Sequence, residues 1–202
     1  MMGVDLSSVN DWEAYVLIFY QGSEIYVKSH FQIPAGSWQA RSEHYGPMTH
    51  QWVSEGHVKV IPGMVHNDQA RVDMIEDLIS RYDVRHIGFD PYNAHKVAKT
   101  LADRYGDDLC VAIRQGVLYL NEPMKDIYRR GLEGMLTHCG NPVMEAHLSA
   151  VQLMQDKNGN YYMDKSKSTD KIDGPAAMVT AMATLLHFED TSYYENNDLV
   201  FI

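Results

Sequence analysis

The chain has 202 residues and a mass of 23.0 kDa. Hydrophobic residues make up 45% and charged residues 22%, a composition that excludes a disordered tail, a collagen-like rod and a small disulfide scaffold. Seventeen basic side chains against 27 acidic ones give a net charge of −10. Because phosphate contacts need clustered Lys and Arg, this acidity argues against a protein that coats nucleic acid by bulk charge.

The cysteines and the N-terminal segment indicate the cellular compartment in which the chain is expected. Cys110 and Cys139 form no CxxC pair and predict no disulfide framework, so we expect a reducing compartment. The N-terminus carries Asp5 and Asp11 in place of a basic segment, and the early apolar run from Tyr15 to Tyr20 is too short to cross a bilayer. We therefore expect no secretion signal, no transmembrane segment and no membrane partner.

The first third of the chain has the pattern of strands. A short apolar run at Gly3–Leu6 is interrupted by one carboxylate. The segment Trp12–Tyr20, WEAYVLIFY, is apolar on both faces and rich in β-branched and aromatic residues, as expected of a central strand. A turn at residues 21–24 then leads into an alternating strand at Ile25–Ile33. These segments predict a meander.

The middle of the chain changes to a helical period. Apolar residues recur at helical spacing from Val72 to Tyr82 and again from Ala94 to Tyr105. Short strands are expected between and after these helices, at Val84–Phe89 and Leu109–Ile113. Alternation of helix and strand is typical of parallel strands joined by crossover helices. Together with the meander, it predicts an α/β fold with a mixed sheet and helices packed against it.

The last third is predicted to be mainly helical. Helices are expected at about 122–136 and about 142–154, followed by a hairpin around residues 156–160. The final helix, Pro175–Phe188, is apolar almost all round and should be largely buried. A buried helix of this kind would fix the position of any side chain at its N-terminus.

Three aspartates stand where predicted elements begin or end. Asp5 interrupts the first strand, Asp90 ends the strand VRHIGF, and Asp173 precedes Gly174-Pro175 at the start of the buried helix. Ligands of open α/β sheets collect at the carboxyl ends of parallel strands. Converging carboxylates would hold hard divalent cations, and two such ions roughly 3.5–4 Å apart can activate water and stabilise the leaving oxygen of a phosphodiester.

The same aspartates also have a purely structural interpretation. Aspartate followed by proline is a common helix start, which would account for Asp90 and nearly for Asp173. Asp5 could begin an Asx turn through Ser7 and Ser8. Taken singly, each residue is better explained as a cap or a turn residue than as a metal ligand, and the pattern alone leaves both interpretations open.

Three ordered segments resemble the nuclease motifs of the large terminase subunit of tailed bacteriophages. They are GVDLSSVNDWEAY, IGFDPYNAHKVAKTLADRYG and GNYYMDKSKSTDKIDGPAAMVTAM. Between them, Arg114-Gln115-Gly116 and the run HCGNPV at residues 138–143 match the usual spacers of this family in the same order. The resemblance extends from Gly3 to about Phe188.

The resemblance implies an RNase H-like fold, a mixed central β-sheet flanked by α-helices. It also implies that Asp5, Asp90 and Asp173 are the catalytic, metal-binding residues, with Mg²⁺ or Mn²⁺ as the metal and two ions bound. The reaction would be endonucleolytic cutting of double-stranded concatemeric DNA during genome packaging, in the cytoplasm of the infected bacterial host. Asp11 is an accessory acid or, more simply, a turn residue. Implied partners are the terminase ATPase domain, the small terminase subunit and the portal.

The sequence departs from the family in two places. Large terminase subunits carry a packaging ATPase, whereas no GxxxxGK[ST] loop occurs here, so we expect residues 1–202 to form a single nuclease domain without the ATPase. Many relatives have a tryptophan and an asparagine soon after the Asn-Pro, where this chain reads EAHLSAV from Glu145 to Val151. Local packing or a substrate contact in that stretch should differ.

Basic residues gather before the third aspartate. From residue 157 to 171, four lysines stand against two aspartates, a local balance of +2. Because this stretch leads directly into Asp173, we expect Lys165, Lys167 or Lys171 to contact the DNA backbone. A solvated hairpin would explain any single lysine there equally well.

Two other functions fit the same residues. One is another RNase H-like nuclease such as a junction resolvase, which would prefer four-way junctions to linear or supercoiled duplex. The other is a non-catalytic docking module of the packaging complex, in which the acids only cap helices and turns. Retention of all three aspartates favours the nuclease.

Overall fold

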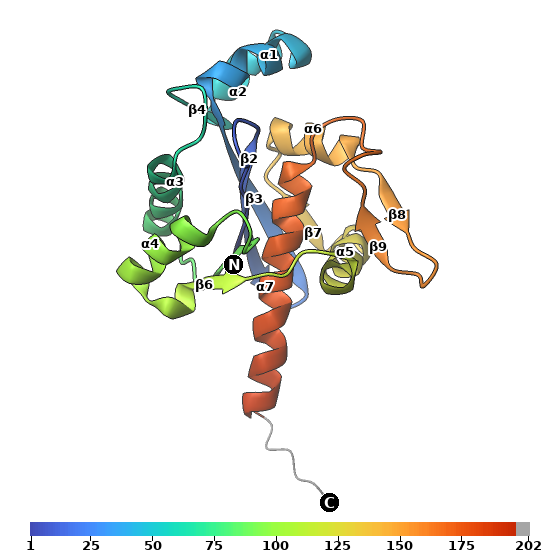
Figure 1. The fold of residues 1–202 in the computed structure, drawn as a ribbon. Coiled ribbons are helices and arrows are strands. Elements are labelled where there is room, and N and C mark those ends of the chain that lie inside the picture. Colours follow the sequence, from blue (N-terminus) through green and yellow to red (C-terminus); the bar gives the residue numbers. More distant parts are fainter. Residues whose placement is uncertain (197–202) are drawn as a thin grey trace, which may run out of the picture.

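A computed structural model describes the backbone of residues 1–196 and the side chains of residues 1–188. Residues 197–202, the end of the expected domain, lie outside the described residues. A sheet of seven strands forms the centre, in the order β4-β3-β2-β1-β5-β6, with β7 also paired to β3 (Figure 1). These strands are β1 (Met2–Asp5), β2 (Glu13–Gln21), β3 (Glu24–Pro34), β4 (Val58–Ile61), β5 (Ile87–Phe89), β6 (Cys110–Ala112) and β7 (Leu136–His138).

The sheet is mixed, as the sequence predicts. The first three strands pair antiparallel as a meander. Strand β5 lies parallel to both β1 and β6, and β3 pairs parallel with β4 and β7. The α/β class with a mixed central sheet is therefore confirmed.

Helices cover both faces of this sheet (Figure 1). The helices are α1 (Ala35–Tyr45), α2 (Met48–Ser54), α3 (Asp68–Arg81), α4 (His95–Tyr105), α5 (Val117–Leu132), α6 (Pro142–Ala150) and α7 (Asp173–Asn196), with a short 3-10 turn at Asp107–Leu109. The hairpin of β8 (Leu153–Gln155) and β9 (Tyr161–Met163) forms a separate small sheet. None of the helices in the described part of the chain is both long and apolar enough to span a membrane.

Strand β2 shows why the segment WEAYVLIFY is apolar on both faces. Ala14, Val16 and Ile18 belong to the core cluster that includes residues of α6 and α7. Tyr15 and Leu17 point the other way, into the cluster formed with α3 and α4. Because successive side chains of a strand alternate, a central strand between two helical layers must be apolar at every position.

Several element boundaries differ from the sequence prediction. Helix α5 begins at Val117, about five residues before its expected start, and contains Pro123. The helix expected to reach residue 154 ends at Ala150, because residues 153–155 pair with β9 instead. Strand β7 forms where the end of a helix was expected, through its parallel pairing with β3. Strand pairing accounts for the last two of these differences.

Two helices lie in a region where the sequence pattern indicates no element. Helix α1 has no fully buried residue, and only two of its apolar side chains, Trp38 and Tyr45, pack against the core, so periodicity gives little indication of it. Helix α2 is only seven residues long and buries Thr49 and Trp52. These helices extend the molecule beyond the end of β3 (Figure 1).

Close packing of α7 on the sheet determines where its N-terminus lies. A Cβ atom at Gly3 of β1 would lie 2.2 Å from both the carbonyl oxygen of Ala177 and the backbone nitrogen of Ala181. A Cβ atom at Gly88 of β5 would lie 2.1 Å from Oγ1 of Thr184. Glycine at position 3 therefore lets the helix backbone approach the sheet directly, and glycine at position 88 makes room for the Thr184 side chain of the helix.

This close approach predicts the stability of one variant. We expect Gly3→Ala to lower the free energy of unfolding by about 1–3 kcal/mol, because the added methyl group meets helix backbone that cannot rotate away. Urea denaturation followed by circular dichroism measures the change. Gly131→Ala in α5 is the control: its Cβ meets no atom within 4 Å, so stability should stay the same or rise slightly. Equal effects of the two substitutions would contradict the packing argument.

Candidate active site

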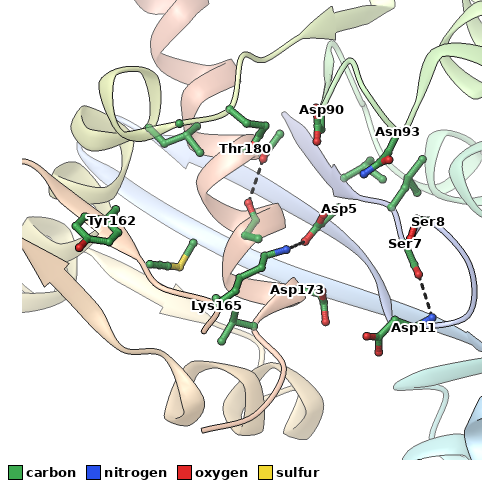
Figure 2. A pocket seen from close by; sticks show the side chains of 18 of the residues that line it. Asp5, Ser7, Ser8, Asp11, Asp90, Asn93, Tyr162, Lys165, Asp173 and Thr180 are labelled. Carbon is green, nitrogen blue, oxygen red and sulfur yellow. Dashed lines mark hydrogen bonds and ion pairs between the residues drawn. The ribbon is translucent and has the colours of Figure 1, made fainter. Parts of the chain in front are cut away.

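Asp5, Asp90 and Asp173 line one open cavity of about 540 Å³ (Figure 2). Asp5 is the last residue of β1, Asp90 directly follows β5, and Asp173 is the first residue of α7. Val4 pairs with Phe89 in the parallel register, so Asp5 and Asp90 leave the sheet side by side at its carboxyl edge. The structure thus brings all three sequence-predicted aspartates to the same cavity.

The hydrogen bonds of these aspartates test the structural interpretation. Asp90 Oδ1 accepts a hydrogen bond from the backbone N–H of Tyr92 at 3.0 Å, which makes a turn; helix α4 begins only at His95. Among the described residues, Asp5 Oδ2 and Asp173 Oδ2 are buried and have no hydrogen-bond partner. Turn formation accounts for one oxygen of Asp90, but neither capping nor a turn accounts for the buried oxygens of the other two.

Burial and mutual repulsion make protonation of two of these carboxyl groups easier. Burial, followed by the nearby charge of Asp5, raises the pKa of Asp173 to about 7. Burial also raises the pKa of Asp5, against the opposing effect of Lys165. Carboxylates in such surroundings are stabilised by added positive charge. Perturbed pKa values of this kind, in a cavity, are typical of functional sites.

The donor set suits a hard cation, although the carboxylates do not form a closed cage. Asp5, Asp90 and Asp173 present oxygen atoms only, the ligands that Mg²⁺ and Mn²⁺ prefer. Two buried oxygens, Oδ2 of Asp5 and Oδ2 of Asp173, accept no hydrogen bond within the described residues, which suits them to a cation. Within residues 1–188, no group of three or more His, Cys, Asp or Glu side chains stands close enough to hold an ion together.

The three lysines predicted to contact DNA have different positions. Lys165 lines the cavity, with Nζ 3.6 Å from Asp5 Oδ2. Lys167 Nζ lies 3.9 Å from Asp164 Oδ2 and is not among the residues lining the cavity. Lys171 donates a hydrogen bond to Asp11 Oδ2. Of the three, Lys165 alone faces the aspartates.

Asp11 acts as a junction between segments. Its carboxylate pairs with Lys171 and, at 3.1 Å, with Arg41 of α1, and it also accepts the N–H of Trp12 at 2.9 Å. Asp11 lines the same cavity. These contacts connect the loop after β1 to the segment that leads into Asp173.

A buried hydrogen-bond network contacts the backbone of the loop after β1. Glu13, fully buried, accepts a hydrogen bond from Arg71 Nε at 2.7 Å, and Arg71 Nη2 donates to the carbonyl oxygen of Ser7 at 2.6 Å. His66 Nδ1 lies 3.0 Å from Glu13, and its Nε2 lies 2.6 Å from the carbonyl oxygen of Asp11. Although burial opposes ionisation, His66 and Arg71 lower the pKa of Glu13. No local sequence pattern marks this network, because its members are far apart in the chain.

His147 supports the first turn of α7. Its Nδ1 accepts a hydrogen bond from the backbone N–H of Gly174 at 3.2 Å, and its fully buried ring packs edge-on against Trp12 and Phe31. Burial lowers the pKa of His147 to about 4, which keeps the ring neutral. His147 lies within the stretch EAHLSAV, so the predicted difference in local packing falls next to Asp173.

A model of the terminase large subunit endonuclease domain matches residues 1–189 of the chain. The chain belongs to this family. The match confirms the resemblance inferred from the three motifs. A relative, the terminase large subunit of Enterobacteria phage HK97, is 28% identical over 182 residues, which cover 89% of this chain and 36% of that protein. This terminase nuclease domain thus spans about a third of the relative's length.

Solved structures share the fold of this terminase nuclease domain. The crystal structure of the HK97 bacteriophage large terminase matches with a TM-score of 0.82 at 25% identity, covering 91% of this chain and 38% of that chain. The large terminase nuclease from thermophilic phage G20c, crystallised with bound magnesium, matches with a TM-score of 0.57 at 10% identity, covering 90% of this chain and 79% of that chain. The predicted RNase H-like fold is confirmed.

The neutral state of His147 makes stability depend on pH. Its pKa is about 4 in the folded chain against 6.5 for an ordinary histidine, so the unfolded chain binds the extra proton between these values. This contribution to stability is fully present above about pH 6.5 and is lost as pH falls toward 4, by up to roughly 3 kcal/mol. Asp173, whose pKa is raised to about 7, has the opposite effect over the same range, so we expect the loss to appear as a difference in urea denaturation between the parent and a His147 variant from pH 7 to 4.

Substitution separates the contribution of His147 from that of other groups. His147→Asn keeps a hydrogen-bond acceptor without the titration, so relative to the parent it should lose less stability, or gain more, as pH falls from 7 to 4, whatever its stability at pH 7. His30, whose pKa burial also lowers to about 4, should contribute equally to both proteins. His50→Asn, at an exposed position, is the control. An unchanged slope in His147→Asn would show that this histidine is not the group responsible.

Proposed function

We propose that this domain is a divalent-metal-dependent endonuclease that cuts duplex concatemeric DNA during phage genome packaging. The observation that carries the proposal is the cavity shared by Asp5, Asp90 and Asp173, in which two buried carboxylate oxygens have no hydrogen-bond partner among the described residues. No cap or turn engages these oxygens, whereas cation binding accounts for both.

Asp5, Asp90 and Asp173 are the proposed catalytic and metal-binding residues. The bound magnesium of the G20c nuclease, which shares the fold, supports Mg²⁺ or Mn²⁺ as the cation here, and we propose two ions. Such ions supply Lewis acidity toward a phosphodiester oxygen and lower the pKa of a bound water. The protein contributes a rigid position for each carboxylate, at two adjacent strand ends and at the start of a buried helix.

DNA binding is proposed to rest on a few local contacts. Lys165, Lys167 and Lys171 are the proposed contacts to the DNA backbone, and Lys165 lies nearest to the aspartates. With a net charge of −10, the domain should bind duplex weakly, and the binding should weaken further with added salt. The remaining DNA-binding affinity would come from other parts of the packaging machinery.

The wider assembly is also a proposal. We propose that the domain works with the terminase ATPase domain, the small terminase subunit and the portal, in the cytoplasm of the infected bacterial host. Family membership and the share of the HK97 protein that this chain spans support this placement. That residues 1–202 form a single nuclease domain remains a prediction.

Plasmid cleavage tests the proposed activity. We expect the parent chain to cut DNA with Mn²⁺ or Mg²⁺ and to lose this activity in EDTA. Asp90→Asn, Asp5→Asn and Asp173→Asn should each reduce the rate by about 100-fold or more, because several kcal/mol of transition-state stabilisation is lost. Asp83→Asn is the matched control, since Asp83 is exposed and pairs with Arg85 outside the cavity.

The outcomes separate the alternatives. Cutting by Asp90→Asn at the parental rate would show that the metal-site assignment is wrong. A preference for four-way junctions over linear or supercoiled duplex would identify a resolvase. A folded parent chain that cuts no DNA with either ion would favour a docking module.

A further inference from the structure

Two ion pairs connect the segment before α7 to the segment at the end of β1. Lys165 pairs with Asp5, and Lys171 pairs with Asp11 (the first pair is drawn in Figure 2). Both lysines come from the stretch between β9 and α7, and both aspartates line the cavity. Both are Lys–Asp pairs between the same two segments, but they differ in burial and in the distance between the charged atoms.

The Lys165 pair is loose. Nζ of Lys165 lies 3.6 Å from Asp5 Oδ2, beyond hydrogen-bonding distance, and the lysine side chain is 67% exposed whereas that of Asp5 is 21% exposed. A pair whose lysine is largely exposed contributes little stability, because solvent screens the ammonium charge and holding a long side chain costs entropy. The ammonium group can therefore leave Asp5 at small cost.

The backbone that carries Lys165 is held independently of this pair. Asp164 Oδ1 accepts hydrogen bonds from the N–H and the hydroxyl of Ser166, at 2.9 and 2.6 Å. The carbonyl oxygen of Asp164 accepts from the backbone N–H groups of Lys167 and Ser168. Only the side chain of Lys165 would have to move when its ammonium group leaves the carboxylate.

The charge of Lys165 balances the carboxylates of the cavity. The negative charge of Asp5 raises the pKa of Lys165 most, and Asp173 adds to this effect, whereas partial burial of the lysine opposes it. The side chain therefore stays protonated. Asp5 Oδ2, the oxygen nearest to this ammonium group, has no hydrogen-bond partner in the described residues. The same oxygen is therefore where a divalent cation would compete with lysine.

We propose that Lys165 is the resident counter-ion of Asp5 and that a divalent cation bound at Asp5 must displace its ammonium group. This inference rests on the proposed function, because it requires a cation at these aspartates. Lys171 has a different role. Its side chain is only 35% exposed, and its partner Asp11 is shared with Arg41, so this pair is a fixed link between Asp11 and the segment before Asp173.

Removing the competitor should strengthen cation binding. We expect Lys165→Met to bind Mn²⁺ about fivefold more tightly than the parent, the factor that corresponds to losing one weak ion pair. Without metal, the same variant should melt at a slightly lower temperature, because the carboxylates lose their counter-ion. Lys165→Arg keeps the charge and should bind Mn²⁺ like the parent.

Titration of the metal in the absence of DNA tests the inference. Free Mn²⁺ is followed by electron paramagnetic resonance, and the melting temperature is recorded with and without Mn²⁺. Lys157→Met makes the same charge change at an exposed position outside the cavity and should leave Mn²⁺ affinity unchanged. Lys171→Met should lower the melting temperature without raising Mn²⁺ affinity. Asp5→Asn should lose most of the Mn²⁺ binding.

The results distinguish failure of the inference from failure of the proposed function. If Asp5→Asn loses Mn²⁺ but Lys165→Met binds it no more tightly than the parent, the counter-ion role is wrong. If Asp5→Asn binds Mn²⁺ as the parent does, both the metal site and the inference are overturned. If Lys165→Met gains affinity while no protein cuts DNA, the inference stands and the nuclease proposal fails.

Discussion

The packing of α7 against β1 and β5 is the contact on which the candidate site depends. Gly3 lets the helix backbone lie directly on β1, and Gly88 lets the Thr184 side chain of the helix pack against β5. Because those same strands end at Asp5 and Asp90, the contact also places Asp173 beside them. His147 then holds the first turn of the helix through Gly174. A single packed interface therefore brings three carboxylates from three parts of the chain to one cavity.

Repulsion between the carboxylates is a second constraint, and it opposes the packing that brings them together. Packing that brings the aspartates together also buries them, which raises the pKa of Asp5 and of Asp173. Lys165 offsets part of this charge, and a bound cation would offset more. Part of the net charge of −10 thus belongs to the site itself. An acidic chain is therefore compatible with a nuclease in which bound metal ions would mediate the contact with phosphate.

Much of the fold follows from local pattern. The strands around Asp5 and Asp90 and the buried helix after Asp173 are encoded by apolar periodicity, which is a property of neighbouring residues. Strand β7 was not predicted, because its pairing with β3, far away in the chain, defines it. The early end of α6 follows from the β8–β9 hairpin, and helix α1 has no fully buried residue that would mark it. His147 could be noticed only as part of a departure from the family pattern.

The sequence by itself determined the family, the α/β class and the three aspartates that stand at the ends of elements, because ordered motifs and periodicity are local properties. The tertiary structure was needed to show that these aspartates share a cavity and that one buried oxygen each of Asp5 and Asp173 has no hydrogen-bond partner in the described residues. It also shows that Lys165 faces these aspartates, whereas Lys167 pairs with Asp164 and Lys171 with Asp11. Burial, hydrogen bonding and the direction of a long side chain depend on segments far away in the chain. Four lysines within fifteen residues look equivalent in sequence, and their different surroundings separate them.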